Sequence, residues 1–183
     1  MASSRLYSYV LSFLDRTSFT VTALTAASLL YTRSAGIAYF CAGGVACSVT
    51  VKLLKRVLRQ PRPEGRSQKR TYGMPSTHAA TISYYGMYIP LACLYLPSHA
   101  SLPAHPSFRA FVTLVAVPWA SLIAVSRIWL GHHTWPQVLV GCSYGCLFAL
   151  GWFALWVYGG LNEYGNIAES YVSAIIKEQL GYH

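Results

Sequence analysis

The residues of this chain that could do chemistry lie in three short polar segments, which interrupt a strongly apolar sequence. The segments are Lys55 with Arg62-Pro63, then Pro75-Ser76-Thr77-His78, then Ser126-Arg127 with His133. Each lies where an apolar stretch ends or begins. Charged side chains in or beside a bilayer are costly and usually serve function. We therefore expect the activity of the protein to reside in these three segments.

The cations and one expected helix start suit a phosphate group. Three permanent cations are present: Lys55, Arg62 and Arg127. Guanidinium groups offer forked donors that match phosphate oxygens, whereas lysine acts as a point charge. Ser76 and Thr77 precede a helix whose first backbone N–H groups attract anions, and Pro75 can stiffen the entry to it. Together these residues predict a compact phosphate-binding cradle.

Two histidines, His78 and His133, could turn this cradle into a catalytic site. One imidazole can attack phosphorus and form a phosphohistidine, while the other protonates the departing oxygen and then activates water. Histidine suits both tasks because its ordinary pKa is about 6.5. A purely structural role for each histidine is the alternative, and a zinc site that adds His132 is another. No carboxylate stands nearby to orient zinc-bound imidazoles, so we interpret His132 as an interfacial or supporting group.

The composition predicts a membrane protein whose chemistry needs no metal or other cofactor. Hydrophobic residues make up 54% of the chain and charged residues 10%, against about 25% charged in soluble proteins. Glu64 is the one carboxylate between Asp15 and Glu163. Mg²⁺ and Ca²⁺ sites are built largely from carboxylate oxygens, so such a centre is not expected. The net charge of +9 is assigned to membrane headgroups and an anionic substrate, and no nucleic-acid partner is expected.

Five apolar segments must position the polar ones. They run over about 17–32, 34–54, 78–96, 110–130 and 137–158. A membrane span needs about 20 apolar residues, so the first segment is short. Polar, proline-containing loops are expected over 60–74 and 97–109. The fold class predicted is an all-α, polytopic transmembrane bundle of about five membrane helices.

The order of these segments brings the polar residues together. If every segment spans, alternation of direction places all three polar segments on one side of the membrane. The predicted phosphatase-like domain covers residues 1–160. The remaining tail, 161–183, carries a possible helix-starting pair, Asn166 and Glu169, and an apolar stripe. This tail is expected to form an interfacial amphipathic helix or to be loosely ordered.

The three segments together resemble the signature of the type 2 phosphatidic acid phosphatase (PAP2) superfamily. The resemblance covers about residues 50–160 and includes the gap of six residues before Arg62 and of five before His133. It implies a PAP2/haloperoxidase-like helical fold. It also implies that His133 is the nucleophile, that His78 is the general acid, and that no metal takes part. The phosphate ligands implied are Lys55, Arg62, Ser76 and Arg127.

One position departs from the general signature. The superfamily ordinarily has Asp four residues after the nucleophile, where this chain has Gln137. An Asp would fix the imidazole tautomer and stabilise its positive charge, and loss of such a charge costs about 10⁴ in rate in the serine-protease triad. Gln137 can still accept the imidazole N–H through its carbonyl oxygen. Gln137, Pro75 and Ser126 are therefore predicted as supporting residues.

The sequence around these motifs resembles the dolichyldiphosphatase branch of the superfamily. The strings are Tyr72-Gly73-Met74-Pro75-Ser76 and His133-Thr134-Trp135-Pro136-Gln137-Val138. The resemblance implies hydrolysis of dolichyl diphosphate to dolichyl phosphate at the lumenal face of the endoplasmic reticulum, which recycles the carrier of N-glycosylation. A broader phosphatase for phosphatidate or a sphingoid phosphate is one alternative. A catalytically silent protein that binds anionic lipid through its basic residues is another.

The basic residues and the resemblance disagree about membrane orientation. Eight of the 14 basic residues lie between Lys52 and Arg70, and lysine and arginine normally mark cytoplasmic loops. The resemblance instead puts this side in the lumen, and we favour it because the motif itself accounts for two of these cations. The length of the lipid tail and the oligomeric state are left open by the sequence.

Overall fold

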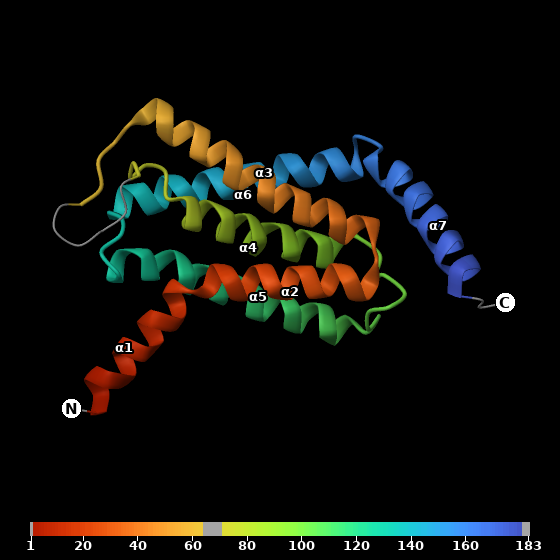
Figure 1. The fold of residues 1–183 in the computed structure, drawn as a ribbon, viewed down its shortest axis with the longest axis horizontal. Helices are drawn as coiled ribbons and strands as arrows, with labels where there is room; N and C mark the ends of the chain where they lie inside the picture. Colours follow the sequence, from red (N-terminus) through yellow and green to blue (C-terminus); the bar gives the residue numbers. More distant parts are fainter. Residues whose placement is uncertain (1, 64–70, 181–183) are drawn as a thin grey trace.

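In the residues that the computed structural model describes, 2–63 and 71–180, the regular structure is entirely helical (Figure 1). The helices are α1 (Ala2–Asp15), α2 (Thr17–Thr32), α3 (Ala35–Leu58), α4 (Thr77–Tyr95), α5 (Pro106–Trp129), α6 (Trp135–Val157) and α7 (Leu161–Leu180). The predicted all-α class is confirmed. Three helices, α3, α5 and α6, are long and apolar enough to cross a membrane, with 24, 24 and 23 residues. The remaining two apolar segments form the shorter helices α2 and α4, of 16 and 19 residues.

Two helices extend beyond their apolar cores for reasons that lie at their ends. Helix α3 continues to Leu58 because Lys55 and Arg56 occupy its last turn, where cations interact favourably with the helix dipole. Helix α5 begins at Pro106, so the prediction of a loop over all of 97–109 is wrong at its end. The Nδ1 atom of His105 accepts a hydrogen bond from the Ser107 backbone N–H at 3.2 Å, and proline suits the first helical position.

Helix α4 is the centre of the bundle. One of its faces, with Ala79 and Ile82, packs in a buried cluster with residues of α5 and with Leu14 of α1. The opposite face, with Ala80, Tyr84 and Tyr88, packs in a second cluster against α3 and α6. The helix that begins with Thr77-His78 is therefore held on several sides, which fixes the position of its N-terminus.

Glycines allow α6 to lie very close to α4. A Cβ atom on Gly141 would stand 2.7 Å from the Ser76 carbonyl oxygen, and one on Gly145 would overlap the Ala80 carbonyl oxygen. Small residues four positions apart let helix backbones approach in this way. Gly43 and Gly44 of α3 have the same effect, because both glycines are buried and lie against the tyrosines of α4.

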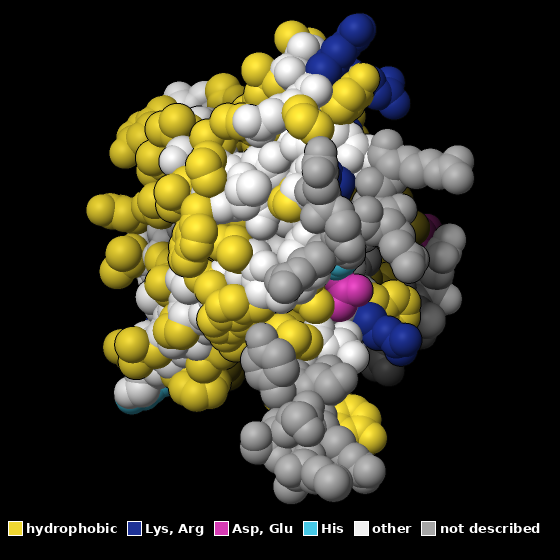
Figure 2. All heavy atoms as spheres, turned by 90° about the vertical axis from the view of Figure 1, so that its left-hand side faces the viewer, with side chains coloured by type: hydrophobic (Ala, Val, Ile, Leu, Met, Phe, Trp, Pro, Cys, Tyr) yellow, Lys and Arg dark blue, Asp and Glu magenta, His cyan; other side chains and the backbone are white. Residues whose placement is uncertain are grey.

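The helix ends that carry the polar segments meet at one end of the bundle. In Figure 1 the end of α3, the start of α4, the end of α5 and the start of α6 all lie on the left. The junction between α1 and α2 lies at the same end. Figure 2 looks onto this end, where Lys and Arg side chains lie near the edge and hydrophobic side chains cover one flank. The predicted convergence of the three segments is therefore confirmed.

The C-terminal segment is a helix, but it does not start as predicted. Helix α7 begins at Leu161, so Asn166 is internal and the proposed capping pair is wrong. Glu169 instead binds outside its own helix: its Oε2 accepts the Ala35 backbone N–H at 2.7 Å, and its Oε1 lies 3.0 Å from His99 Nε2. The carboxylate thereby satisfies a backbone donor at the start of α3.

The candidate active site

A cavity of about 950 Å³ opens at the end of the bundle where the polar segments meet. Its lining includes six of the predicted site residues: Lys55, Arg62, Thr77, His78, Arg127 and His133. Lys52 and Arg56 add two further cations, and no Asp or Glu is among the described residues that line it. A cavity with this lining attracts an anion, and the imidazoles of His78, His132 and His133 border the same space.

His133 has its proton on Nδ1, because of its two hydrogen bonds. Its Nδ1 lies 3.3 Å from Oε1 of Gln137, and its Nε2 lies 3.1 Å from Nη1 of Arg62. Arg62 can only donate, so Nε2 accepts, and Nδ1 donates to the amide oxygen. Nε2 is therefore the nitrogen that carries the free lone pair.

Gln137 is itself held by groups that fix which way its amide points. Its Nε2 donates to the Pro61 carbonyl at 2.9 Å and to Gln60 Oε1 at 3.2 Å. Its Oε1 also accepts the Thr134 backbone N–H at 3.2 Å. Thr134 is the N-cap of α6, and Pro136 lies in the first turn. Gln137 is buried, and its amide nitrogen faces two acceptor oxygens, those of Pro61 and Gln60. A carboxylate in this place would be repelled by both oxygens, because it has no N–H to donate.

Burial and charge together keep His133 neutral. Burial lowers the pKa of His133 most, and the positive charges of Arg62 and Lys55 lower it in the same direction. Hydrogen bonds to Gln137 and to the Gly73 backbone act in the opposite sense, and the resulting pKa is about 3 instead of 6.5. The imidazole is therefore unprotonated at neutral pH.

Two of the predicted phosphate ligands are held by backbone carbonyls at the mouth of the cavity. Lys55 Nζ donates to the Tyr72 carbonyl at 3.2 Å. Arg62 donates from Nε to the Thr71 carbonyl at 2.7 Å and from Nη1 to the His132 carbonyl at 2.8 Å. The loop around Tyr72 and the end of α3 are thereby tied to the segment that carries His133. Glu64 and the basic residues Arg66, Lys69 and Arg70 lie outside the described residues.

Arg127 is fully buried and is oriented from α1. Its Nη1 lies 3.2 Å from Asp15 Oδ1, and its Nη2 donates to the Leu14 carbonyl. Its Nε and Nη2 reach Ser126 Oγ at 3.2 and 3.0 Å, which supports the predicted supporting role of Ser126. Asp15 also lies 3.3 Å from His132 Nε2. A carboxylate thus fixes the guanidinium in place beside the cavity.

The Ser76 side chain was predicted to bind phosphate, but it does not line the cavity. It is fully buried, and its Oγ accepts the Ala79 backbone N–H at 3.4 Å as the N-cap of α4. Its own backbone N–H donates to the Gln137 carbonyl at 3.0 Å. Pro75 is buried beside it. Ser76 and Pro75 therefore position the start of α4, while Thr77 and His78 reach the cavity.

Asp15 and Gln60 were not predicted from the sequence as site residues. Asp15 precedes the first apolar segment, and no short-range pattern connects it with Arg127. Gln60 lies two residues before Arg62 and carries no charge. The zinc alternative lacks a ligand set, since the described residues contain no group of three or more His, Cys, Asp or Glu side chains that could hold a metal ion.

Comparison with known proteins agrees with this architecture. The family described as "PAP2 superfamily" matches residues 34–160. "Dolichyldiphosphatase 1" of Homo sapiens is 36% identical over 118 residues, which are 61% of this chain and 49% of that protein. "Lipid phosphate phosphatase epsilon 1, chloroplastic" of Arabidopsis thaliana is 27% identical over 79% of this chain and 50% of that protein. The chain spans about half the length of the curated relatives it matches.

A solved structure shares the fold. The crystal structure of a transmembrane PAP2-type phosphatidylglycerolphosphate phosphatase from Bacillus subtilis superposes with a TM-score of 0.66 at 21% identity, over 82% of this chain and 76% of that one. The likeness concerns the arrangement of the helices. The family match covers the whole segment from Ser34 to Gly160, which contains all three polar segments. This membrane-embedded helical protein therefore belongs to the PAP2 superfamily.

Proposed function

We propose that the protein is a lipid diphosphate phosphatase that hydrolyses dolichyl diphosphate to dolichyl phosphate and inorganic phosphate. The observation that carries the proposal is that one cavity is lined by His78, His133 and the cations Lys55, Arg62 and Arg127 of the first and third segments. The relatives named dolichyldiphosphatase support the choice of substrate, as does Gln137 at the position where the general signature has Asp.

In the proposed reaction, His133 Nε2 attacks the terminal phosphorus. The new N–P bond forms as the P–O bond to dolichyl phosphate breaks, and protonated His78 gives its proton to the departing bridging oxygen. Arg62 hydrogen-bonds to the same Nε2 in the resting protein, so it must turn toward the phosphate oxygens before attack. This exchange couples substrate binding to release of the nucleophile.

The second half of the reaction regenerates the site. Neutral His78 takes a proton from water, and the water oxygen attacks the phosphorus of the phosphohistidine. The N–P bond breaks, inorganic phosphate leaves, and the electron pair returns to His133 Nε2. Arg127, Lys55 and Arg62 stabilise the charge on the equatorial oxygens in both steps. Thr77 lies at the start of α4 and adds backbone and hydroxyl donors to this cradle.

A broader lipid phosphate phosphatase is the alternative, and it is favoured by the Arabidopsis relative, which matches a larger share of this chain. Phosphate release by purified protein should be compared for dolichyl diphosphate, phosphatidate and a sphingoid phosphate. We expect dolichyl diphosphate to give the highest kcat/KM. Equal or higher rates with phosphatidate would establish the alternative instead.

The same assay tests the chemistry. We expect His133→Ala to abolish turnover and EDTA to leave the wild-type rate unchanged. If His133→Ala retained full activity, the site assignment would be wrong, and if no lipid released phosphate, a silent anionic-lipid-binding protein would be the better description. Loss of activity in EDTA and recovery with Mg²⁺ would overturn the phosphohistidine route.

We also propose that the protein resides in the endoplasmic reticulum with the cavity facing the lumen and acts in carrier recycling for N-glycosylation. The proposal rests on the similarity to proteins named dolichyldiphosphatase. The many Lys and Arg residues of the 52–70 segment favour the opposite, cytoplasmic, orientation. A glycosylation acceptor inserted at Ser67, which lies outside the described residues, tests it. Glycan addition supports the lumenal orientation, and an unmodified tag contradicts it.

A further inference from the structure

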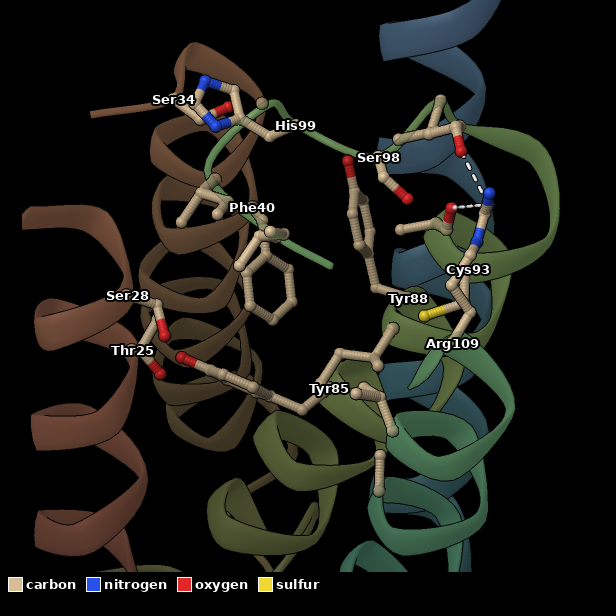
Figure 3. Close-up of a pocket in the computed structure, with 18 of the residues that line it drawn as sticks. Thr25, Ser28, Ser34, Phe40, Tyr85, Tyr88, Cys93, Ser98, His99 and Arg109 are labelled. Carbon is tan, nitrogen blue, oxygen red and sulfur yellow. Dashed lines mark hydrogen bonds between the residues drawn. The ribbon is translucent and has the colours of Figure 1, made fainter. Parts of the chain in front are cut away.

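A second cavity of about 490 Å³ lies beyond Tyr85 and reaches toward the end of the bundle opposite His78 and His133 (Figure 1). Its walls come from α2, α3, α4 and α5 and from the loop that joins α4 to α5. Most side chains that face it are apolar, including Phe40, Ile89 and Trp119. Figure 3 shows Phe40, Tyr85, Tyr88 and Cys93 around this space. A cavity of this character suits hydrocarbon rather than a polar ligand.

The second cavity adjoins the first one. Four residues line both spaces: Val21, Thr25, Ile82 and Tyr85. Two belong to α2 and two to α4, so these side chains form the boundary between the phosphate end and the apolar space. A ligand that holds its phosphates beside His133 meets this boundary at Tyr85 before it reaches the apolar space.

Tyr85 stands at the junction and is fixed there. Its ring lies against Gly44 of α3, where a Cβ atom would be 3.1 Å from the ring. It also packs edge-on against Phe40, with ring centroids 4.9 Å apart. Figure 3 shows its hydroxyl directed toward Thr25 and Ser28 of α2. The ring thus stands between the two cavities.

The apolar cavity is long enough for more than a short chain. It is lined along α4 from Ile82 to Leu96, and a rise of 1.5 Å per residue makes this stretch about 21 Å long. Leu24, which also lines it, is 64% exposed, so the cavity communicates with the bilayer beside α2. A long chain can enter here and leave its excess length in the lipid.

We propose that this cavity binds the isoprenoid chain of the diphosphate substrate and selects for its length. This inference rests on the proposed function. The first isoprene units would pass Tyr85, and the following ones would lie along Ile89, Cys93 and Leu96. Each buried methylene contributes about 0.8 kcal/mol, so a chain that fills the cavity binds more tightly than one that ends near Tyr85.

Cys93→Trp tests the proposal by filling the cavity beyond Tyr85. The measured quantity is the ratio of kcat/KM for a long-chain polyprenyl diphosphate to that for farnesyl diphosphate. We expect this ratio to fall about tenfold, which corresponds to losing the burial of roughly two methylene groups. Leu94→Trp is the matched control, because Leu94 is the next residue of α4, is 72% exposed and does not line the cavity. We expect this control to leave the ratio unchanged.

A second pair of variants guards against misfolding. Ala116→Trp fills the cavity from the α5 wall, and Val115→Trp, at a residue that is 50% exposed, is its control. A ratio that falls in both cavity variants and in neither control supports the proposal. A ratio that stays constant in the folded cavity variants, or that falls equally in the controls, overturns it and points to a chain that lies in the bilayer.

A binding measurement distinguishes failure of the chain-binding site from failure of the proposed function. In a His133→Ala background, affinity for a long-chain polyprenyl diphosphate is measured by microscale thermophoresis, with and without Cys93→Trp. We expect the added tryptophan to weaken binding about tenfold here too. If the wild type hydrolyses nothing and the binding difference persists, only the proposed function fails. If turnover is normal but neither ratio nor binding responds, only the chain site fails.

Discussion

The amide oxygen of Gln137 and the Nδ1 atom of His133 lie 3.3 Å apart, and this contact decides which imidazole nitrogen faces the cavity. Gln137 cannot turn its amide over, because its nitrogen donates to both Pro61 and Gln60. The tautomer of His133 is therefore set by hydrogen bonds that reach the residues just after α3. We propose that this neutral amide orients the imidazole as a carboxylate would.

Gln137→Ala removes this orientation and should lower kcat about 10²-fold or more, since positioned proton acceptors contribute at that level. We expect KM to change little, because Gln137 does not line the cavity. Gln137→Asp should fail to restore the rate, since its carboxylate would be too short to span the contact and would face the Pro61 carbonyl. Steady-state kinetics of the two variants measure both expectations. A fully active Gln137→Ala would remove this residue from the site.

The pH dependence of kcat/KM should reflect the lowered pKa of His133. Because that pKa is about 3, the imidazole stays neutral as pH falls from 7 to 5, and His133 should cause no loss of activity in that range. Lys55→Met removes a nearby positive charge, so protonation becomes easier and the pKa rises. We expect the acid limb of the profile to move to higher pH in this variant, whatever its absolute rate.

Lys52→Met is the control for this profile, because Lys52 also borders the cavity but is not among the groups that shift the pKa of His133. Its acid limb should coincide with that of the wild type. An acid limb that moves equally in both variants would mean that general surface charge, rather than the Lys55 contact, sets the profile.

Gly145→Ala should destabilise the bundle and slow the enzyme. The added methyl group would overlap the Ala80 carbonyl oxygen of α4, and relieving such a clash typically costs about 1–3 kcal/mol. Thermal unfolding in detergent measures the loss. Gly151→Ala on the same helix has nothing within 4 Å of the new atom and should be neutral or slightly stabilising. Equal unfolding temperatures for the two variants would show that close α4–α6 packing is not required.

Asp15→Ala should destabilise the protein and lower its activity, although Asp15 belongs to α1, which lies outside the segment that matches the family. Arg127 is 1% exposed, and removal of its carboxylate partner costs about 1–2 kcal/mol after allowance for the solvent exposure of Asp15. We expect a lower unfolding temperature together with a lower kcat/KM. Asp15→Glu should recover part of both.

Glu163→Ala is the control for the Asp15 variant, because it removes the same charge from an exposed position of α7. It should match the wild type in stability and in rate. A comparable loss in Glu163→Ala would mean that net charge, rather than the pairing with Arg127, produces the effect.

The sequence by itself determined the helices and most of the residues that border the cavity. Apolar length and helix-start signals are local, so α2 to α6 could be read with small errors at their ends. The chemistry could also be predicted from the sequence, because cations and histidines are rare in apolar segments. The residues concerned are Lys55, Arg62, Arg127, His78 and His133. Alternation of the spans then placed them at one end of the bundle.

The tertiary structure alone decided how these residues are held. Asp15 reaches Arg127 across 112 positions of sequence, and Gln60 reaches Gln137 across 77. The buried Ser76 hydroxyl caps α4, and Glu169 satisfies the start of α3 rather than its own helix. The apolar cavity beyond Tyr85 likewise exists only between helices. Hydrogen-bond partners and cavities depend on which surfaces pack together, and no local pattern of residue types encodes that choice.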